Sequence, residues 1–279
     1  MGTDVVLLLE ADGARADRAL AAARAEIDRL ERVLSRFRPA SELSRLNRAG
    51  AMRVGPDLAR VLLRALAARA ASGGRFDPTV HAAVRAAGYA DALPAPGDPI
   101  PGGAGGAPCG GAVAIDACTR EVLMGPGVAL DLGGIAKGDA ADRAVEILAA
   151  AGPALAAVGG DLAVSGPRAD GAAWAVGTGA GPTIALRRGG VATSGVDRRR
   201  WRGPEGWRHH VIDPATGRPA RTDLMRVTAV GDDAVAAEVR ATDLLLRGAT
   251  AARRHADRLG VPCVLVPALG APVAAGGLR

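Results

Sequence analysis

Lysine is almost absent from this sequence. The chain has 35 Lys and Arg residues, and Lys137 is the only lysine among them. Arginine therefore supplies the general positive charge, while one position has kept an ammonium group. An ammonium is a compact point charge with rotatable donors, whereas a guanidinium is a planar fork of five donors. We therefore expect Lys137 to serve a specific role in which an ammonium is preferred.

Aromatic residues are also scarce, at 2% of the chain, so the core must be built from Ala, Val and Leu. With 279 residues and 49% hydrophobic content, the chain is long enough to bury such a core. The two phenylalanines, Phe37 and Phe76, both fall in polar, turn-rich segments. Two interpretations are open for them: stacking against a flat ligand, or ordinary packing in the core.

The sequence has few cysteines and no long apolar run. Cys109, Cys118 and Cys263 show no metal-binding or redox spacing, so we expect free thiols in a reducing compartment. The first residues include no basic region and only a short apolar stretch, which argues against a signal peptide or a transmembrane span. These features favour a cytoplasmic protein without a membrane anchor.

The net charge of +6 permits an anionic partner. Most arginines, however, alternate with Ala and Asp in helical segments, where a solvated helix face is the simpler interpretation. The sequence has no zinc-finger or RNA-binding signature, so we expect no nucleic-acid partner. The segment DRRRWRGPEGWRHH (197–210) is denser in charge, and it can form a local anion-binding edge.

Hydrophobic periodicity predicts an α+β or mixed α/β fold in a single domain over residues 1–279, with a Pro/Gly-rich loop at about 92–111. Helices are predicted at 14–36, 56–72, 136–150, 234–247 and 249–259, with Ser41 capping a further short helix. Strands are predicted at 3–9, 111–117, 120–124, 128–133, 154–158, 161–165, 173–177, 183–187, 190–193, 208–212, 226–230 and 263–266.

The segment DLGGIAKGDAAD (131–142) reads as a strand end, a glycine turn and the start of a helix. Backbone N–H groups at a helix start suit an anion or a phosphate, and Lys137 adds a point charge there. Asp131 can accept hydrogen bonds from ribose hydroxyls or a base. The alternative is a simple glycine turn beside a surface lysine.

Two further segments carry candidate chemistry. In HHVIDPATGRPA (209–220), a tight turn from Asp213 to Gly217 follows His210, which is either catalytic or structural. In AAEVRATDLLLRG (236–248), Glu238 and Thr242 are four residues apart and share one helix face. Hard oxygen ligands of this kind suit Mg²⁺.

Taken in order, these segments resemble the ApbE family of FAD:protein FMN transferases. The resemblance covers nearly the whole chain apart from the Pro/Gly-rich stretch and the residues after 248. It is carried by MGT (1–3), SRF with SELSRLN (35–47), GRFDPTV (74–80), LDLGGIAKGDAAD (130–142), VGGDLAVSG (158–166), ATSG (192–195), HHVIDPATGRPA (209–220) and AAEVRATDLLLRG (236–248).

The resemblance implies an ApbE-like α+β fold and a Mg²⁺-dependent reaction. FAD would be cleaved at its pyrophosphate, FMN would be joined through a phosphoester to a threonine of an acceptor protein, and AMP would be released. The protein would be a monomer or a homodimer. The FAD site would comprise Met1, Phe37, Phe76, Asp77, Thr79, Asp131, Lys137, His210 and Ile212. The metal would be held by the Gly134 carbonyl, Glu238 and Thr242, and the catalytic residues would be Lys137, His210 and Glu238.

Some positions depart from the pattern of the family. Glu238 stands where the family usually has aspartate, and Asp243 is an alternative source of the carboxylate. Asp139 replaces a common tyrosine, and Ala157–Val158 replaces Asn-Ile or Asn-Leu. These changes bear on turnover more than on flavin binding. An FAD pyrophosphatase, a flavin-binding protein without catalysis and a basic scaffold without a nucleotide site are the alternative functions.

Overall fold

The computed structural model describes residues 3–90, 106–203 and 206–278, and the chain forms two compact units. Unit 1 comprises Met1–Glu31, Gly134–Ser194 and Asp223–Arg279, and unit 2 comprises Arg32–Gly133 and Gly195–Thr222. The single domain over residues 1–279 stays a prediction. Most of the predicted Pro/Gly-rich loop at 92–111 lies outside the described residues, which resume at Gly106.

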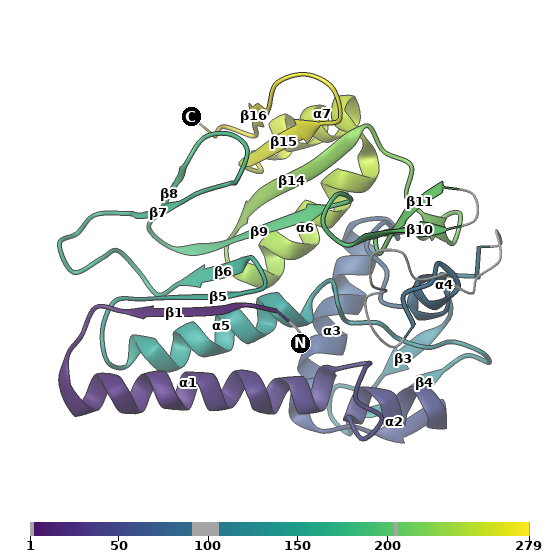
Figure 1. The fold of residues 1–279 in the computed structure, drawn as a ribbon. Helices are drawn as coiled ribbons and strands as arrows, with labels where there is room; N and C mark the ends of the chain where they lie inside the picture. Colours follow the sequence, from purple (N-terminus) through teal and green to yellow (C-terminus); the bar gives the residue numbers. More distant parts are fainter. Residues whose placement is uncertain (1–2, 91–105, 204–205, 279) are drawn as a thin grey trace. The chain divides into compact units, whose positions relative to one another are not determined.

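Unit 1 is built on a seven-stranded sheet in the order β1–β5–β6–β9–β14–β15–β16 (Figure 1). Its strands are β1 (Val5–Leu9), β5 (Ala154–Val158), β6 (Asp161–Val164), β9 (Gly189–Gly195), β14 (Leu224–Gly231), β15 (Cys263–Pro267) and β16 (Val273–Ala275). Gly159 and Gly160, at φ 63° and 97°, connect β5 to the antiparallel β6. Positive φ at both positions is the type I′ geometry that two-residue hairpin turns need, which accounts for the glycine pair.

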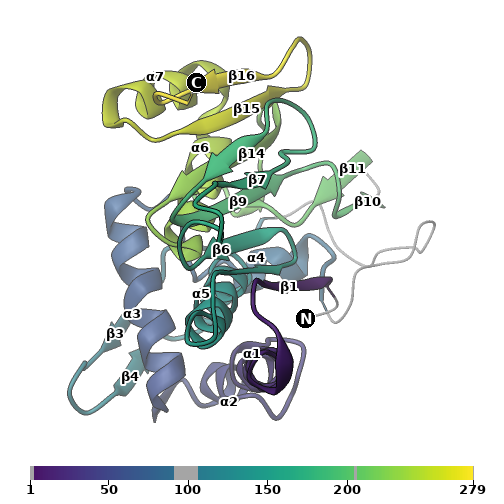
Figure 2. The same ribbon diagram turned by 90° about the vertical axis from the view of Figure 1, so that its left-hand side faces the viewer.

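The helices of unit 1 pack against this sheet. Helices α5 (Ala136–Ala149) and α6 (Ala234–Arg247) contact each other and the sheet, and α7 (Ala249–Leu259) packs against α6 and β15 (Figure 2). A separate hairpin, β7 (Trp174–Val176) with β8 (Ile184–Leu186), contributes residues to a buried hydrophobic cluster. This cluster consists of Leu155, Val164, Trp174, Ile184, Leu186 and Val191.

Unit 2 combines short helices with small sheets. Its helices are α2 (Glu42–Ala49), α3 (Pro56–Ala71) and α4 (His81–Ala86). A three-stranded sheet has the order β2 (Ala51–Arg53), β4 (Glu121–Met124), β3 (Val113–Ile115). Two hairpins complete the unit, β10 (Arg200–Gly203) with β11 (Gly206–His209), and β12 (Ile212–Asp213) with β13 (Arg218–Pro219). Helix α1 (Gly13–Leu34) begins in unit 1 and ends in unit 2.

The predicted α+β class and the five long helices are confirmed. Helical spacing predicts a buried face of α1 that comprises Leu20, Ala23, Ile27, Leu30 and Leu34. Leu20 is half-buried, and the other four are buried. Ser41 caps α2, because its hydroxyl accepts a hydrogen bond from the Ser44 N–H at 3.0 Å. Cys109, Cys118 and Cys263 are free thiols, also as predicted.

Two predicted strands are wrong. Residues 128–133 form no strand, and the strand predicted at 208–212 is split, because β11 ends at His209 and β12 begins at Ile212. At the first site the side chain of Asn47 takes the place of a strand partner. Its amide accepts from the Leu130 N–H at 2.8 Å and donates to the Leu130 carbonyl at 2.9 Å. The backbone is thus satisfied without a sheet, which an apolar sequence pattern does not reveal.

We expect Asn47→Ala to lower the free energy of unfolding by about 2–6 kcal/mol, since it leaves two backbone groups unsatisfied and each costs about 1–3 kcal/mol. Arg48→Ala on the exposed face of the same helix is the control, with an expected change within about 0.5 kcal/mol. Urea denaturation followed by circular dichroism measures both. Equal stability of the two variants would contradict the role given to Asn47.

Candidate functional site

The single lysine lies between two buried carboxylates in unit 1. The ammonium of Lys137 is 3.0 Å from Asp161 Oδ2 and is hydrogen-bonded to Glu238 Oε1. Glu238 Oε2 accepts from the Gly138 N–H at 2.9 Å. Asp161 and Glu238 are 2% and 3% exposed, so the two carboxyl groups are almost fully removed from water, whereas the Lys137 side chain is 17% exposed. The lysine that the composition singles out therefore serves as an internal counter-ion.

The motif around Lys137 explains how the cluster is assembled. A Cβ on Gly138 would stand 2.8 Å from the Ala234 carbonyl oxygen, so only glycine lets α5 approach the start of α6 this closely. One turn later, the Asp142 carboxylate accepts from the N–H groups of Ala234 and Val235, at 2.8 and 3.2 Å. A carboxylate at a helix N-terminus is favourable. The two contacts fix Glu238, one turn into α6, against Lys137.

The cluster places two carboxyl groups beside one ammonium. Burial and the neighbouring Asp161 raise the pKa of Glu238 to about 8, against the opposing effect of Lys137. Burial alone would lower the pKa of Lys137, but the carboxyl groups of Asp161 and Glu238 raise it above its usual value. The lysine therefore stays charged, whereas Glu238 is mostly protonated at neutral pH, because a second buried negative charge beside Asp161 is unfavourable. A cation bound beside Glu238 would favour its ionised form.

Thr242 lies one turn beyond Glu238 on α6, and its hydroxyl is 2.8 Å from the hydroxyl of Ser194. Gly134 is in the turn before α5. Asp243 does not join this group: its carboxylate is paired with Arg247 of the same helix at 2.9 Å. Glu238, rather than Asp243, is thus the carboxylate beside Lys137.

The oxygen atoms near Lys137 are of the type that Mg²⁺ prefers. Asp161 Oδ2 is buried and is ion-paired with the Lys137 ammonium at 3.0 Å, and among the described residues it has no hydrogen bond of good geometry. This incompletely satisfied oxygen and the neighbouring Glu238 carboxyl group fit a divalent cation, which would favour the ionised form of Glu238. Among the described residues no group of three or more His, Cys, Asp and Glu side chains is arranged to hold a metal. A site here would therefore need hydroxyl, carbonyl or water oxygens as well.

The other candidate residues lie in unit 2, where Asp131 is already paired. Its carboxylate is 2.8 Å from Arg36 Nε and accepts from the Gly133 N–H at 2.7 Å. The Arg36 guanidinium also stacks over two rings, 4.0 Å from the centroid of Phe37 and 4.7 Å from that of Tyr89. Arg36 was not among the residues predicted for the site, and it connects two that were.

Asp77 and Thr79 stabilise a loop of their own unit. Asp77 accepts hydrogen bonds from the Thr79 backbone and hydroxyl, both at 2.8 Å, and from the Gly110 N–H at 2.9 Å. Asp77 and Thr79 are both buried. Asp77 and Thr79 therefore have a structural role in this loop, which accounts for their presence in the GRFDPTV motif.

The two phenylalanines differ in environment. Phe76 is 5% exposed, as core packing requires, whereas Phe37 is 40% exposed. The Phe37 ring centroid lies 5.5 Å from that of Tyr89, which in turn is 5.8 Å from that of Trp201. Phe37 is thus the accessible end of a row of three rings, a surface suited to a flat ligand.

The two adjacent histidines also differ. His209 Nε2 is 3.0 Å from the Ala220 carbonyl, and burial lowers its pKa. His210 Nδ1 is 3.4 Å from the Arg199 carbonyl, at the base of the β10–β11 hairpin. Ile212 is buried in a cluster with Trp201. Met1 lies outside the described residues.

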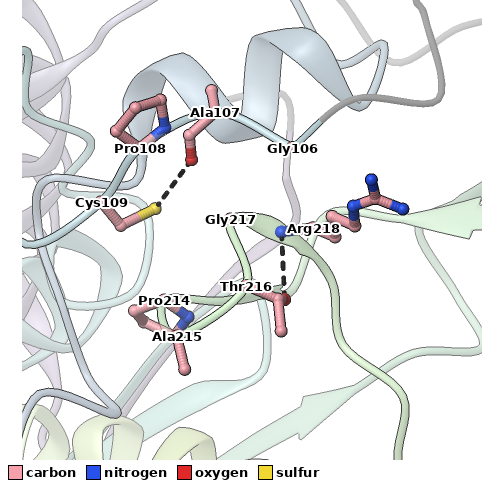
Figure 3. Close-up of a pocket in the computed structure, with 9 residues that line it drawn as sticks. All are labelled: Gly106, Ala107, Pro108, Cys109, Pro214, Ala215, Thr216, Gly217 and Arg218. Atoms are coloured by element: carbon pink, nitrogen blue, oxygen red, sulfur yellow. Dashed lines mark hydrogen bonds between the residues drawn. The ribbon is translucent and has the colours of Figure 1, made fainter.

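Unit 2 contains a pocket of about 430 Å³ beside the predicted Asp213–Gly217 turn (Figure 3). The turn is confirmed, since the Gly217 N–H donates to the Asp213 carbonyl at 2.8 Å. Of the nine lining residues, Cys109 and Arg218 have ionisable side chains, and burial raises the pKa of the Cys109 thiol to about 11. A protonated thiol is a poor nucleophile, so we assign no chemistry to this pocket.

Sequence reasoning missed Asp161 as a site residue. The GGD sequence at 159–161 is the signal that identifies it, because a glycine turn places the first residue of β6 next to Lys137. Gly159 is close to the lysine as well: a Cβ there would stand 3.1 Å from Lys137 Cδ.

Comparison with known proteins decides the family, because the model of the ApbE family matches residues 1–265. The chain belongs to the ApbE family. The FAD:protein FMN transferase of Treponema pallidum (strain Nichols) is 32% identical over 78% of this chain and 68% of that protein. The FAD:protein FMN transferase of Rhodobacter capsulatus is 32% identical over 80% of this chain, but this chain spans only 46% of that protein.

Solved structures of the ApbE family have the same fold. The ApbE protein of Thermotoga maritima matches with a TM-score of 0.81 at 25% identity, over 98% of this chain and 94% of that chain. The apo form of the Pseudomonas stutzeri flavinyl transferase ApbE also gives a TM-score of 0.81, at 21% identity, over 99% and 92% of the two chains. The ApbE-like α+β fold is thereby confirmed. Among the described residues, no helix is both long and apolar enough to cross a bilayer.

We expect Lys137→Met to lower the free energy of unfolding by about 3–5 kcal/mol, because it leaves the buried Asp161 carboxylate without its counter-ion and removes the hydrogen bond to Glu238. Lys137→Arg keeps the charge but must fit a larger group beside Gly159, so its expected cost is about 1–3 kcal/mol. Denaturant unfolding at neutral pH measures both variants. A Lys137→Met protein as stable as the wild type would refute the counter-ion role.

Proposed function

We propose that this chain is an FAD:protein FMN transferase that requires Mg²⁺, modifies a threonine of an acceptor protein and releases AMP. The names of the relatives support FAD as the donor and a protein as the acceptor. In this chain, the observation that carries the proposal is the buried cluster of Lys137, Asp161 and Glu238, with two carboxyl groups beside one ammonium. A divalent cation would favour the ionised form of both carboxyl groups and would in turn attract a pyrophosphate.

The proposed ligands of Mg²⁺ are the Gly134 carbonyl, Glu238 and Thr242, and Asp161 shares the Lys137 ammonium with Glu238. When bound, Mg²⁺ would neutralise negative charge on the pyrophosphate and on the leaving phosphate. Lys137 orients Glu238 and keeps part of the carboxylate charge balanced. The usual aspartate is one methylene shorter than Glu238, and the Gly138 N–H holds the longer side chain in place.

The proposed reaction is a phosphoryl-type transfer. The threonine hydroxyl oxygen forms a bond to the phosphorus of the FMN half, and the bond from that phosphorus to the bridging oxygen breaks. The bridging oxygen leaves with AMP, and the hydroxyl proton passes to a base and then to solvent. Chemistry of this type depends mainly on positioning and electrostatics. Lys137, His210 and Glu238 remain the residues proposed for this task.

Further residues proposed as flavin contacts belong to unit 2. Phe37 offers an accessible ring face for stacking, and Arg36 holds both this ring and Asp131 in place. His210 and Ile212 belong to the proposed contacts as well. Phe76, Asp77 and Thr79 are buried, so we propose that they shape the site by holding the loop at Gly110.

Incubation of the purified chain with FAD, MgCl₂ and a threonine-containing peptide should add one FMN mass to the peptide and release AMP. The matched peptide with valine in place of threonine should stay unmodified. Mass spectrometry and chromatography of the nucleotides measure both products. Free FMN and AMP without a peptide adduct would indicate the FAD pyrophosphatase. Bound FAD without turnover would indicate a catalytically impaired binder, and no FAD binding would refute the proposal.

The pair Glu238→Asp and Glu238→Gln tests the carboxylate. We expect Glu238→Gln to reduce turnover at least about 100-fold, because it removes the charge that attracts the cation. Glu238→Asp keeps the charge, so activity should persist with a changed Mg²⁺ dependence. Initial rates across a MgCl₂ titration measure the effect. Wild-type Mg²⁺ dependence in Glu238→Gln would exclude this residue as a ligand.

A further inference from the structure

The β10–β11 hairpin of unit 2 exposes an unusual group of side chains. Of the three tryptophans, Trp174 and Trp201 are 6% and 4% exposed, whereas Trp207 is 57% exposed. The Arg200 guanidinium lies 4.6 Å from the Trp207 ring centroid, and that of Arg202 lies 5.2 Å away. We call these three residues the Arg–Trp face.

Strand geometry explains why these residues share one side. Side chains alternate along a strand, so Arg200 and Arg202 point to one face while Trp201 points to the other. Arg202 is paired with Trp207 across the hairpin, and Arg200 with His209. Trp201 and Arg208 are buried on the inner side, whereas Arg200, Arg202 and Trp207 are exposed. One of the few aromatic residues of the chain, Trp207, is therefore exposed on the outer face of the hairpin.

The charge of this face indicates the chemistry of its partner. The described residues of the hairpin carry no carboxylate, and Glu205 lies outside them. Two guanidiniums around an exposed ring provide donors for carboxylates and an apolar surface between them. Arginines two residues apart on a strand are separated by roughly 7 Å, which matches acidic residues at alternate positions of an extended segment.

The face is also close to residues proposed for the flavin site. The chain passes from β11 directly to His210 and Ile212. His210 Nδ1 contacts the Arg199 carbonyl immediately before β10, so both ends of the hairpin meet at His210. A protein segment bound to the hairpin is thereby held near a residue assigned to the nucleotide.

We propose that the Arg–Trp face of the β10–β11 hairpin binds an acidic, extended segment of the acceptor protein next to its target threonine. This inference rests on the proposed function, of which it specifies the partner. It assigns no role in FAD cleavage to Arg200, Arg202 or Trp207.

The test uses a fluorescein-labelled peptide with one threonine and aspartates at alternate positions. The matched neutral peptide has asparagine in place of each aspartate. Arg200→Glu/Arg202→Glu and Trp207→Ala alter the face. Arg188→Glu/Arg254→Glu changes two exposed arginines of unit 1 and gives the same change in net charge.

Fluorescence anisotropy without FAD should show binding of the acidic peptide at least about tenfold tighter than that of the neutral peptide. The Arg200→Glu/Arg202→Glu variant should lose this preference, Trp207→Ala should weaken binding, and Arg188→Glu/Arg254→Glu should match the wild type. In the transfer assay, the face variants should raise the KM for the acidic peptide and leave FAD binding and FAD hydrolysis unchanged.

Several outcomes would overturn the inference. These are equal binding of the two peptides, an equal loss in Arg188→Glu/Arg254→Glu, and equally tight binding of a single-stranded oligonucleotide at the same face. Loss of FAD binding in the face variants would instead assign the hairpin to the nucleotide. A wild-type chain that binds the acidic peptide at this face but never processes FAD would refute the proposed function, while the binding result stands.

Discussion

The ammonium of Lys137, held between Asp161 and Glu238, is the interaction on which the architecture of unit 1 depends. It joins three elements, α5, β6 and α6, that are far apart in the sequence. Gly138 and Asp142 serve the same junction, one by leaving room for the Ala234 backbone and the other by capping α6. Removing charges from water is costly, so such a cluster persists only where packing holds its members in position.

This arrangement gives a physical reason for the biased composition. Arginine suffices on exposed helix faces, but its planar fork is larger and less adaptable than an ammonium. At Lys137 the available space is limited by Gly159, and two carboxylates approach from different elements. The ammonium group, which is compact and has rotatable donors, can contact both carboxyl groups. The same pair of carboxyl groups is the basis of the proposed divalent-cation site.

Unit 2 relies on a different principle, in which side chains satisfy the backbone. Asn47 provides both hydrogen bonds to Leu130, and Asp77 holds the loop at Gly110. Because Asn47 satisfies the Leu130 backbone, the segment at 128–133 forms no strand, although its sequence pattern is typical of one. Asp77 and Thr79 belong to the GRFDPTV motif, and their buried hydrogen bonds give them a structural role in this loop.

The sequence by itself determined the α+β class, the long helices, the Ser41 cap and the family, because periodicity, capping residues and ordered motifs are local properties. It also singled out Lys137, Glu238 and Thr242. It did not identify Asp161 and Arg36 as partners, and it did not distinguish the accessible Phe37 from the buried Phe76. Those features were decided by tertiary structure, since they depend on which distant segments approach one another. Periodicity predicts which face of a helix is buried, but which distant side chains pair, and which of two phenylalanines stays accessible, depends on the folded chain.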